Sequence, residues 1–240
     1  MVSSAFILKG VFSVKVLAIR HVEIEDLGMM EDIFREKNWS FEYLDTPKGE
    51  KLERPLEEYS LVVLLGGYMG AYEEEKYPFL KYEFQLIEEA LKKEIPFLGI
   101  CLGSQMLAKV LGASVYRGKN GEEIGWFFVK KVSDDRFFGE FPDRLLVFQW
   151  HGDTFDLPRG ATRVFTSEKY ENQGFVYEKA VGLQFHIEVG ARTMKRWIEA
   201  YKSELEEKKI DPGVLLETAE REEKVLKGLL RSLLERMVEN

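Results

Sequence analysis

The strongest constraint on the fold is the segment at residues 99–103, Gly-Ile-Cys-Leu-Gly, which directly follows an apolar run at residues 95–98. Gly-x-nucleophile-x-Gly between a buried strand and a helix is typical of a nucleophile elbow. The two glycines leave room for the strand and the helix to approach closely. The sequence therefore predicts a strand–turn–helix unit with Cys101 at its tip, where the helix N-terminus favours a thiolate.

Cys101 is the only cysteine of the 240 residues, so the chain has no internal disulfide. A free cysteine is usually a small buried hydrophobe, and that alternative stays open until partner residues are found. A single thiol and the absence of zinc-type cysteine spacing favour the reduced cytoplasm as the location of the protein.

A partner appears at residues 182–188, Gly-Leu-Gln-Phe-His-Ile-Glu, an alternating apolar segment that predicts a strand ending at the edge of a sheet. Residues two apart on a strand share a face, so we expect His186 and Glu188 to point the same way. Glu188 would accept the Nδ1 proton of His186 and leave Nε2 free to deprotonate Cys101. A lone histidine at a strand end is more often structural, but the paired carboxylate favours a catalytic base.

The two motifs Gly-Ile-Cys-Leu-Gly-x-Gln and Gln-Phe-His-x-Glu-Val together resemble those of the class I glutamine amidotransferases, and the resemblance runs from about Val14 to Val189. The family usually has proline where this chain has Ile187, at a position that shapes the backbone and does no chemistry. The resemblance implies a hydrolase that attacks the side-chain amide of glutamine through a thioester on Cys101, with His186 and Glu188 completing the triad. No metal and no organic cofactor is implied.

A glycine-rich loop, Gly-Gly-Tyr-Met-Gly at residues 66–70, follows the apolar run at residues 61–65. Such a loop at the end of a strand can expose the N–H donors that an oxyanion needs. By resemblance, the donors are the N–H groups of Gly67 and Leu102. From the residues alone the loop could equally bind phosphate or form a plain turn, although the dinucleotide spacing and the Walker lysine are absent.

The resemblance also implies residues that hold the substrate. In the family a His-Gly-Asp loop binds the α-amino and α-carboxylate groups of glutamine, and it corresponds to His151, Gly152 and Asp153. Gln105 resembles the family's glutamine-binding residue, and Asp153 is the anion nearest to hand for the α-amino group. His151 has a plain alternative, which is to brace the loop.

The order of elements predicts a three-layer α/β fold. Strand-like and helix-like segments alternate from Ser13, which indicates a mainly parallel, flavodoxin-like central sheet, and an antiparallel extension follows Gly112. Helices are expected over Glu23–Lys37, from Pro78, from the elbow to Gly112, over Arg192–Glu207 and from Pro212. We divide the chain into an amidotransferase domain, residues 13–190, and a C-terminal helical extension, residues 191–240, whose apolar stripe packs on the same domain or on a twin subunit.

The net charge of −8 argues against a nucleic-acid or anionic-membrane partner. No stretch approaches the length of a membrane span, and Met1–Phe12 lacks the pattern of a signal peptide. Charged residues make up 32% of the chain, which leans towards a thermophile.

Two other functions remain open at this point. A γ-glutamyl peptidase or conjugate hydrolase would share the chemistry up to the thioester, with Tyr68, Met69 and Tyr72 lining its leaving-group side. A non-catalytic binding protein on the same scaffold is the second alternative, and the intact triad argues against it. Free glutamine as substrate would call for a separate synthetase subunit that accepts the ammonia. A homo-oligomer is also compatible with the sequence.

Overall fold

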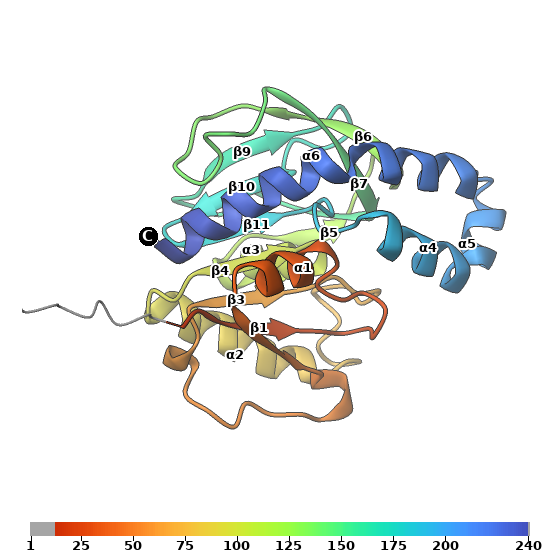
Figure 1. Cartoon of the computed structure of the whole chain (residues 1–240). Coiled ribbons are helices and arrows are strands. Elements are labelled where there is room, and N and C mark those ends of the chain that lie inside the picture. Colours follow the sequence, from red (N-terminus) through yellow and green to blue (C-terminus); the bar gives the residue numbers. More distant parts are fainter. Residues whose placement is uncertain (1–12, 240) are drawn as a thin grey trace, which may run out of the picture.

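The computed structural model describes residues 13–239, so the expectation about a leader in Met1–Phe12 lies outside the described residues. Its centre is a nine-stranded sheet in the order β2-β1-β3-β4-β11-β10-β9-β6-β7 (Figure 1). The first five strands in this order are parallel: β2 (Ser40–Leu44), β1 (Lys15–Ile19), β3 (Leu61–Leu64), β4 (Phe97–Ile100) and β11 (Ala180–Leu183). The other four are antiparallel: β10 (Gly174–Tyr177), β9 (Thr162–Thr166), β6 (Glu123–Lys131) and β7 (Arg144–His151).

Helices cover both faces of the parallel half, because its strands are buried on both sides. α2 (Phe79–Lys92) and α3 (Leu102–Val110) pack on one face, and α1 (Met29–Glu36) and α6 (Pro212–Glu239) pack on the other. Short 3₁₀ turns, η1 (Thr46–Lys48) and η2 (Leu56–Glu58), lie between β2 and β3, and β5 (Val115–Arg117) pairs with β8 (Asp153–Phe155) in a small separate sheet. The expected three-layer α/β fold is confirmed.

Three elements differ from the sequence-based expectation by more than one or two residues at an end. The first helix begins at Met29 instead of Glu23, because Gly28 takes a φ of 52° and its N–H is bonded to the Asp26 carboxylate. The helix expected over Arg192–Glu207 is two helices, α4 (Ala191–Ala200) and α5 (Lys202–Glu207), since Tyr201 between them leaves helical backbone angles. The strand expected over residues 182–188 ends at Leu183.

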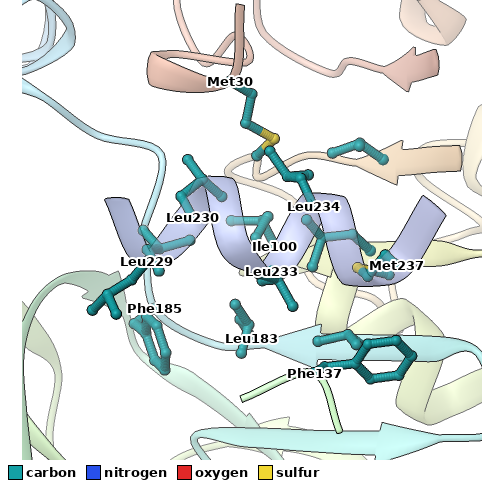
Figure 2. Packing of buried hydrophobic residues seen from close by; sticks show 14 of the residues in the cluster. Met30, Ile100, Phe137, Leu183, Phe185, Leu229, Leu230, Leu233, Leu234 and Met237 are labelled. Carbon is teal, nitrogen blue, oxygen red and sulfur yellow. The ribbon is translucent and has the colours of Figure 1, made fainter. Parts of the chain in front are cut away.

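The long helix α6 packs on the sheet through its apolar stripe. Figure 2 shows Leu229, Leu230, Leu233, Leu234 and Met237 packed with residues of the sheet and of α1, and all five are buried. Burying a leucine fully contributes roughly 2 kcal/mol, so this stripe adds substantially to stability. The C-terminal helices thus share a core with the sheet, and the division of the chain at residue 190 stays a proposal.

Within residues 13–239, no helix has the length and apolar character needed to cross a lipid bilayer.

Candidate active site

Cys101 lies at the turn between β4 and α3. It has a positive φ of 50° with ψ of −109°, the strained conformation expected of an elbow. The flanking glycines are required by space: a Cβ on Gly99 would lie 2.5 Å from the carbonyl oxygen of Gly103, and a Cβ on Gly103 would lie 2.1 Å from that of Leu64. The elbow therefore holds the Cys101 side chain at the carboxyl ends of the parallel strands, directly before the N-terminus of α3.

His186 and Glu188 meet although they do not lie on a regular strand. His186 follows the end of β11 and is held by a hydrogen bond from its backbone N–H to the carbonyl oxygen of Phe148, at 2.8 Å. Its Nδ1 lies 2.7 Å from Oε1 of Glu188, and both residues are 2% exposed. The expected pairing is present, but the backbone that creates it is an irregular segment docked on β7.

The electrostatics of His186 favour a charged ring. Burial alone lowers the pKa of His186, but the negative charges of Glu188 and Cys101 and their hydrogen bonds outweigh burial and raise that pKa well above 6.5. Since Nδ1 is bonded to Glu188, the nitrogen left for the Cys101 sulfur is Nε2. The three side chains form one interacting unit.

Two residues near the sulfur were not assigned a role from the sequence. The side-chain amide of Gln184 donates to the Cys101 sulfur at 3.7 Å, and the sulfur lies 3.8 Å from the carbonyl oxygen of Trp150. Gln184 lies inside the motif that contains His186, but a glutamine there gives no sign of a role by itself. Its full burial, which would point to one, is seen only in the folded structure.

A cavity of about 240 Å³ opens beside Cys101 and His186. Gly67 and Leu102 both line it, as the oxyanion assignment requires. Leu102 is the first residue of α3, and the first N–H groups of a helix have no partner within the helix. Met69 and Tyr68 also line the cavity.

The expected substrate-binding residues line the same cavity. The amide nitrogen of Gln105 donates to Gln184 at 3.2 Å and to the carbonyl oxygen of Asp153 at 3.5 Å, which directs its own amide oxygen elsewhere. The guanidinium of Arg117 lies directly over Gly152, because a Cβ on Gly152 would lie 2.0 Å from its Nη1. That guanidinium lies 3.7 Å from the carboxylate of Asp153.

Arg117 is a residue that sequence reasoning missed. It ends β5, which pairs with β8 so that Arg117 stands opposite Asp153. Its guanidinium lines the cavity, is 61% exposed, and forms ion pairs with Glu122 as well as with Asp153. A lone arginine outside any motif carried no signal.

His151 has its side chain fully committed to the protein. Its Nδ1 bonds the carbonyl oxygen of Asp153 at 2.8 Å, and its Nε2 bonds Glu123 at 3.0 Å. The ring therefore braces the loop, which is the plain alternative, and a contribution of His151 to substrate binding would come from its backbone. In the part of the chain that the structure describes, no cluster of three or more His, Cys, Asp or Glu residues is arranged to hold a metal ion.

The chain is similar in sequence and in fold to known proteins. The family model for "Glutamine amidotransferase class-I" matches residues 33–201. A crystal structure of a glutamine amidotransferase from Thermotoga maritima superposes with a TM-score of 0.94 at 93% identity, covering 95% of this chain and 99% of that one.

One curated relative is a GMP synthase, and another is a subunit of such a synthase. A glutamine-hydrolysing GMP synthase from Thermomicrobium roseum is 35% identical over 129 residues, 53% of this chain and 23% of that protein. One subunit of the glutamine-hydrolysing GMP synthase from Archaeoglobus fulgidus is 34% identical over 119 residues, 45% of this chain and 63% of that protein. The chain thus spans only about a quarter of the length of the first synthase. With its own fold, elbow and matched family model, this chain belongs to the class-I glutamine amidotransferase family.

Proposed function

We propose that this protein hydrolyses the side-chain amide of glutamine through a γ-glutamyl thioester on Cys101. The observation that carries the proposal is the interacting set of Cys101 at a strained elbow and His186 held by Glu188 at 2.7 Å. A nucleophile, a base and a group that orients the base are the minimum that amide cleavage by covalent catalysis needs.

The steps follow from the positions of the groups. The Cys101 sulfur attacks the amide carbon as a thiolate, while Nε2 of the charged His186 ring holds the proton. The N–H groups of Gly67 and Leu102 stabilise the oxyanion. His186 then gives its proton to the departing ammonia, and afterwards it activates a water molecule that hydrolyses the thioester. Glu188 keeps the His186 ring in the productive tautomer and orientation throughout.

The other end of the cavity suits an amino acid. The carboxylate of Asp153 and the amide oxygen of Gln105 are acceptors for an α-ammonium group. Arg117 supplies a guanidinium, which matches a carboxylate in charge and in its paired donors. We assign the α-carboxylate of the substrate to Arg117.

The test is Cys101→Ser, with Cys101→Ala beside it. Both variants should lose at least about 10³-fold in ammonia release from glutamine, because a hydroxyl or methyl group cannot replace the thiol as nucleophile. Unchanged thermal unfolding shows that the fold is intact, and mass spectrometry of the wild type should detect a γ-glutamyl adduct on Cys101. Full activity of either variant would remove Cys101 from the mechanism.

The acceptor of the ammonia belongs to the same proposal. One relative is named as a GMP synthase and another as a subunit of such a synthase. We propose a separate synthetase subunit as the partner that accepts the ammonia, because one of these relatives is itself a subunit of such a synthase.

A second candidate is hydrolysis of γ-glutamyl amines, and one observation favours it. The His186 side of the cavity, from which the leaving group departs, carries the carboxylates of Glu25 and Glu204. Glu25 bonds the Tyr201 hydroxyl and Glu204 bonds the Trp150 indole, and within residues 13–239 neither carboxylate forms an ion pair. Carboxylates flanked by aromatic rings suit an ammonium group on the leaving amine.

A matched pair of substrates separates the two candidates. γ-Glutamyl-1,4-diaminobutane has a distal ammonium group, and γ-glutamyl-butylamine has none. A γ-glutamyl amine hydrolase should prefer the former, and Glu204→Gln should reduce kcat/KM for it by about tenfold while leaving glutamine unaffected. Glutamine cleaved faster than either conjugate would decide for the first candidate.

A further inference from the structure

A buried histidine lies directly behind the oxyanion loop. His21 follows β1 and Gly66 follows β3, and these strands are parallel neighbours, so their carboxyl ends meet at one edge of the sheet. Leu65 continues the pairing through a hydrogen bond from its N–H to the carbonyl oxygen of Ile19. The side chains of His21 and of Glu83, on α2, are both 0% exposed, and neither residue lines the cavity.

His21 bridges the loop to α2. Its Nδ1 lies 2.8 Å from the carbonyl oxygen of Gly66, and its Nε2 lies 2.8 Å from Oε2 of Glu83. The hydroxyl of Thr46 donates to the other oxygen of Glu83. A carbonyl oxygen and a carboxylate both accept hydrogen bonds, so each ring nitrogen carries a proton. Burial lowers the pKa of His21, but Glu83 and the Gly66 carbonyl outweigh burial and raise it, which agrees with a charged ring.

The hydrogen bond to Gly66 fixes the direction of the next N–H group. The carbonyl of Gly66 and the N–H of Gly67 belong to one peptide unit, and residues 13–239 contain no cis peptide bond. In a trans peptide these two groups point in opposite directions. Since His21 does not line the cavity and Gly67 does, we infer that its bond to the Gly66 carbonyl leaves the N–H of Gly67 directed towards the cavity.

Packing holds the same peptide from its sides. A Cβ on Gly67 would lie 3.0 Å from the Cβ of His21 and 3.2 Å from Cδ2 of Leu102, so the loop fits closely between His21 and α3. A buried ion pair such as His21–Glu83 is weak support for stability, because desolvation offsets much of its attraction. The position of the His21–Glu83 pair behind the Gly67 N–H points instead to a role in orienting that group.

We propose that His21, held by Glu83, is a positioning residue that fixes the Gly66–Gly67 peptide so that the Gly67 N–H is aimed at the oxyanion. This inference rests on the proposed amide hydrolysis. His21 touches neither the substrate nor the sulfur. It acts by preventing rotation of one peptide unit, and its charge lies behind the site where negative charge develops.

Two matched variants test the proposal. In His21→Asn, the side-chain amide can keep the donor to Gly66 that Nδ1 provides, whereas His21→Leu fills the space without a donor. Loss of one oxyanion donor typically costs 10²–10³ in kcat, so a mispositioned donor in His21→Leu should lower kcat by about 10–10²-fold with KM changed less than about threefold. His21→Asn should recover most of that loss.

Alkylation of Cys101 by iodoacetamide provides a control, because that reaction forms no oxyanion and so does not use the Gly67 N–H. Its rate should be the same in both variants and in the wild type, measured below their unfolding temperatures. Equal kcat in His21→Leu and wild type would overturn the proposal. An equal fall in kcat and alkylation rate would also overturn it, since that pattern indicates general damage to the site.

A crystal structure of His21→Leu tests the same idea without any substrate. The Gly66–Gly67 peptide should rotate or adopt two orientations in this variant and keep one orientation in His21→Asn. An unchanged peptide would refute the role of His21. A wild type that hydrolyses neither glutamine nor γ-glutamyl amines would refute the proposed function instead, and the peptide orientation would still decide whether His21 positions the loop.

Discussion

The His186–Glu188 and His151–Glu123 regions look alike and are arranged for different ends. Both pairs are buried, with ring-to-carboxylate distances of 2.7 Å and 3.0 Å. They differ at the second ring nitrogen. Nδ1 of His151 is hydrogen-bonded to the backbone carbonyl of Asp153, whereas Nε2 of His186 interacts with Cys101. A histidine paired with a carboxylate is therefore no sign of a catalytic base until its other nitrogen has been accounted for.

The carboxylates of Glu123 and Glu188 also differ in how many hydrogen bonds they accept. Glu123 is also bonded by the hydroxyl of Ser167 and the amide of Gln173, so its charge is shared among several donors. Oε2 of Glu188 is buried and has no hydrogen-bond partner among the described residues, so the charge of Glu188 acts mainly on His186. The His151–Glu123 pair braces the loop, and we propose that the His186–Glu188 pair moves the proton in amide hydrolysis.

The largest expected effect contrasts the two histidines. His186→Gln should lower kcat for ammonia release by at least about 10³-fold, because no other group can shuttle the proton between sulfur and ammonia. His151→Gln should lower kcat less than about threefold, while raising KM and lowering Tm by loosening the substrate loop. Steady-state kinetics and thermal unfolding measure both. Comparable losses of kcat in the two variants would show that the comparison is wrong.

The two carboxylates offer a smaller contrast. Glu188→Gln should reduce turnover by at least about tenfold, because the amide can present its NH₂ to His186 and favour the wrong tautomer. KM should change little, since Glu188 does not contact the substrate. Glu123→Gln is the matched control and should leave kcat nearly unchanged. A loss confined to KM in Glu188→Gln would assign that residue to binding.

Asp153→Asn tests the substrate-binding end of the cavity, beside His151. We expect KM for glutamine to rise by about tenfold with little change in kcat, because a charged hydrogen bond to the α-ammonium group is lost. Asp156→Asn is a control directly after the same strand, β8, and outside the cavity; among the described residues, its side chain accepts a hydrogen bond from the Tyr116 hydroxyl. If kcat falls as much as KM rises, Asp153 does more than bind the substrate.

The smallest effect concerns stability and pH. Burial raises the pKa of Glu123, but hydrogen bonds and charge from His151 outweigh burial and leave it below 4.5. A lowered pKa means that the ionised Glu123 stabilises the fold above pH 4.5, and that this contribution is lost as the pH falls through the folded pKa. Unfolding midpoints in denaturant between about pH 7 and pH 3 should fall more steeply for the wild type than for Glu123→Gln. Parallel curves would contradict this assignment.

Much of the site could be predicted because its signals are local. The glycines around Cys101 specify a turn that the neighbouring peptide groups enforce, since no side chain fits at Gly99 or Gly103. The spacing of His186 and Glu188 predicted their pairing, although the regular strand assumed for it ends at Leu183. His186 and Glu188 do pair, but for a different reason: the irregular segment that contains them is hydrogen-bonded to Phe148 of β7.

The sequence by itself determined the elbow, the alternation of strands and helices, and the apolar stripe of α6, because short-range sterics and hydrophobic periodicity act over a few residues. Only the tertiary structure decided which groups surround the cavity. Arg117 reaches Asp153 through strand pairing, Gln184 reaches the sulfur from a buried segment, and His21 reaches Gly66 because β1 and β3 are adjacent. These contacts join residues that lie 36, 83 and 45 positions apart. Their formation depends on strand order and register, which the whole core fixes and no local pattern encodes.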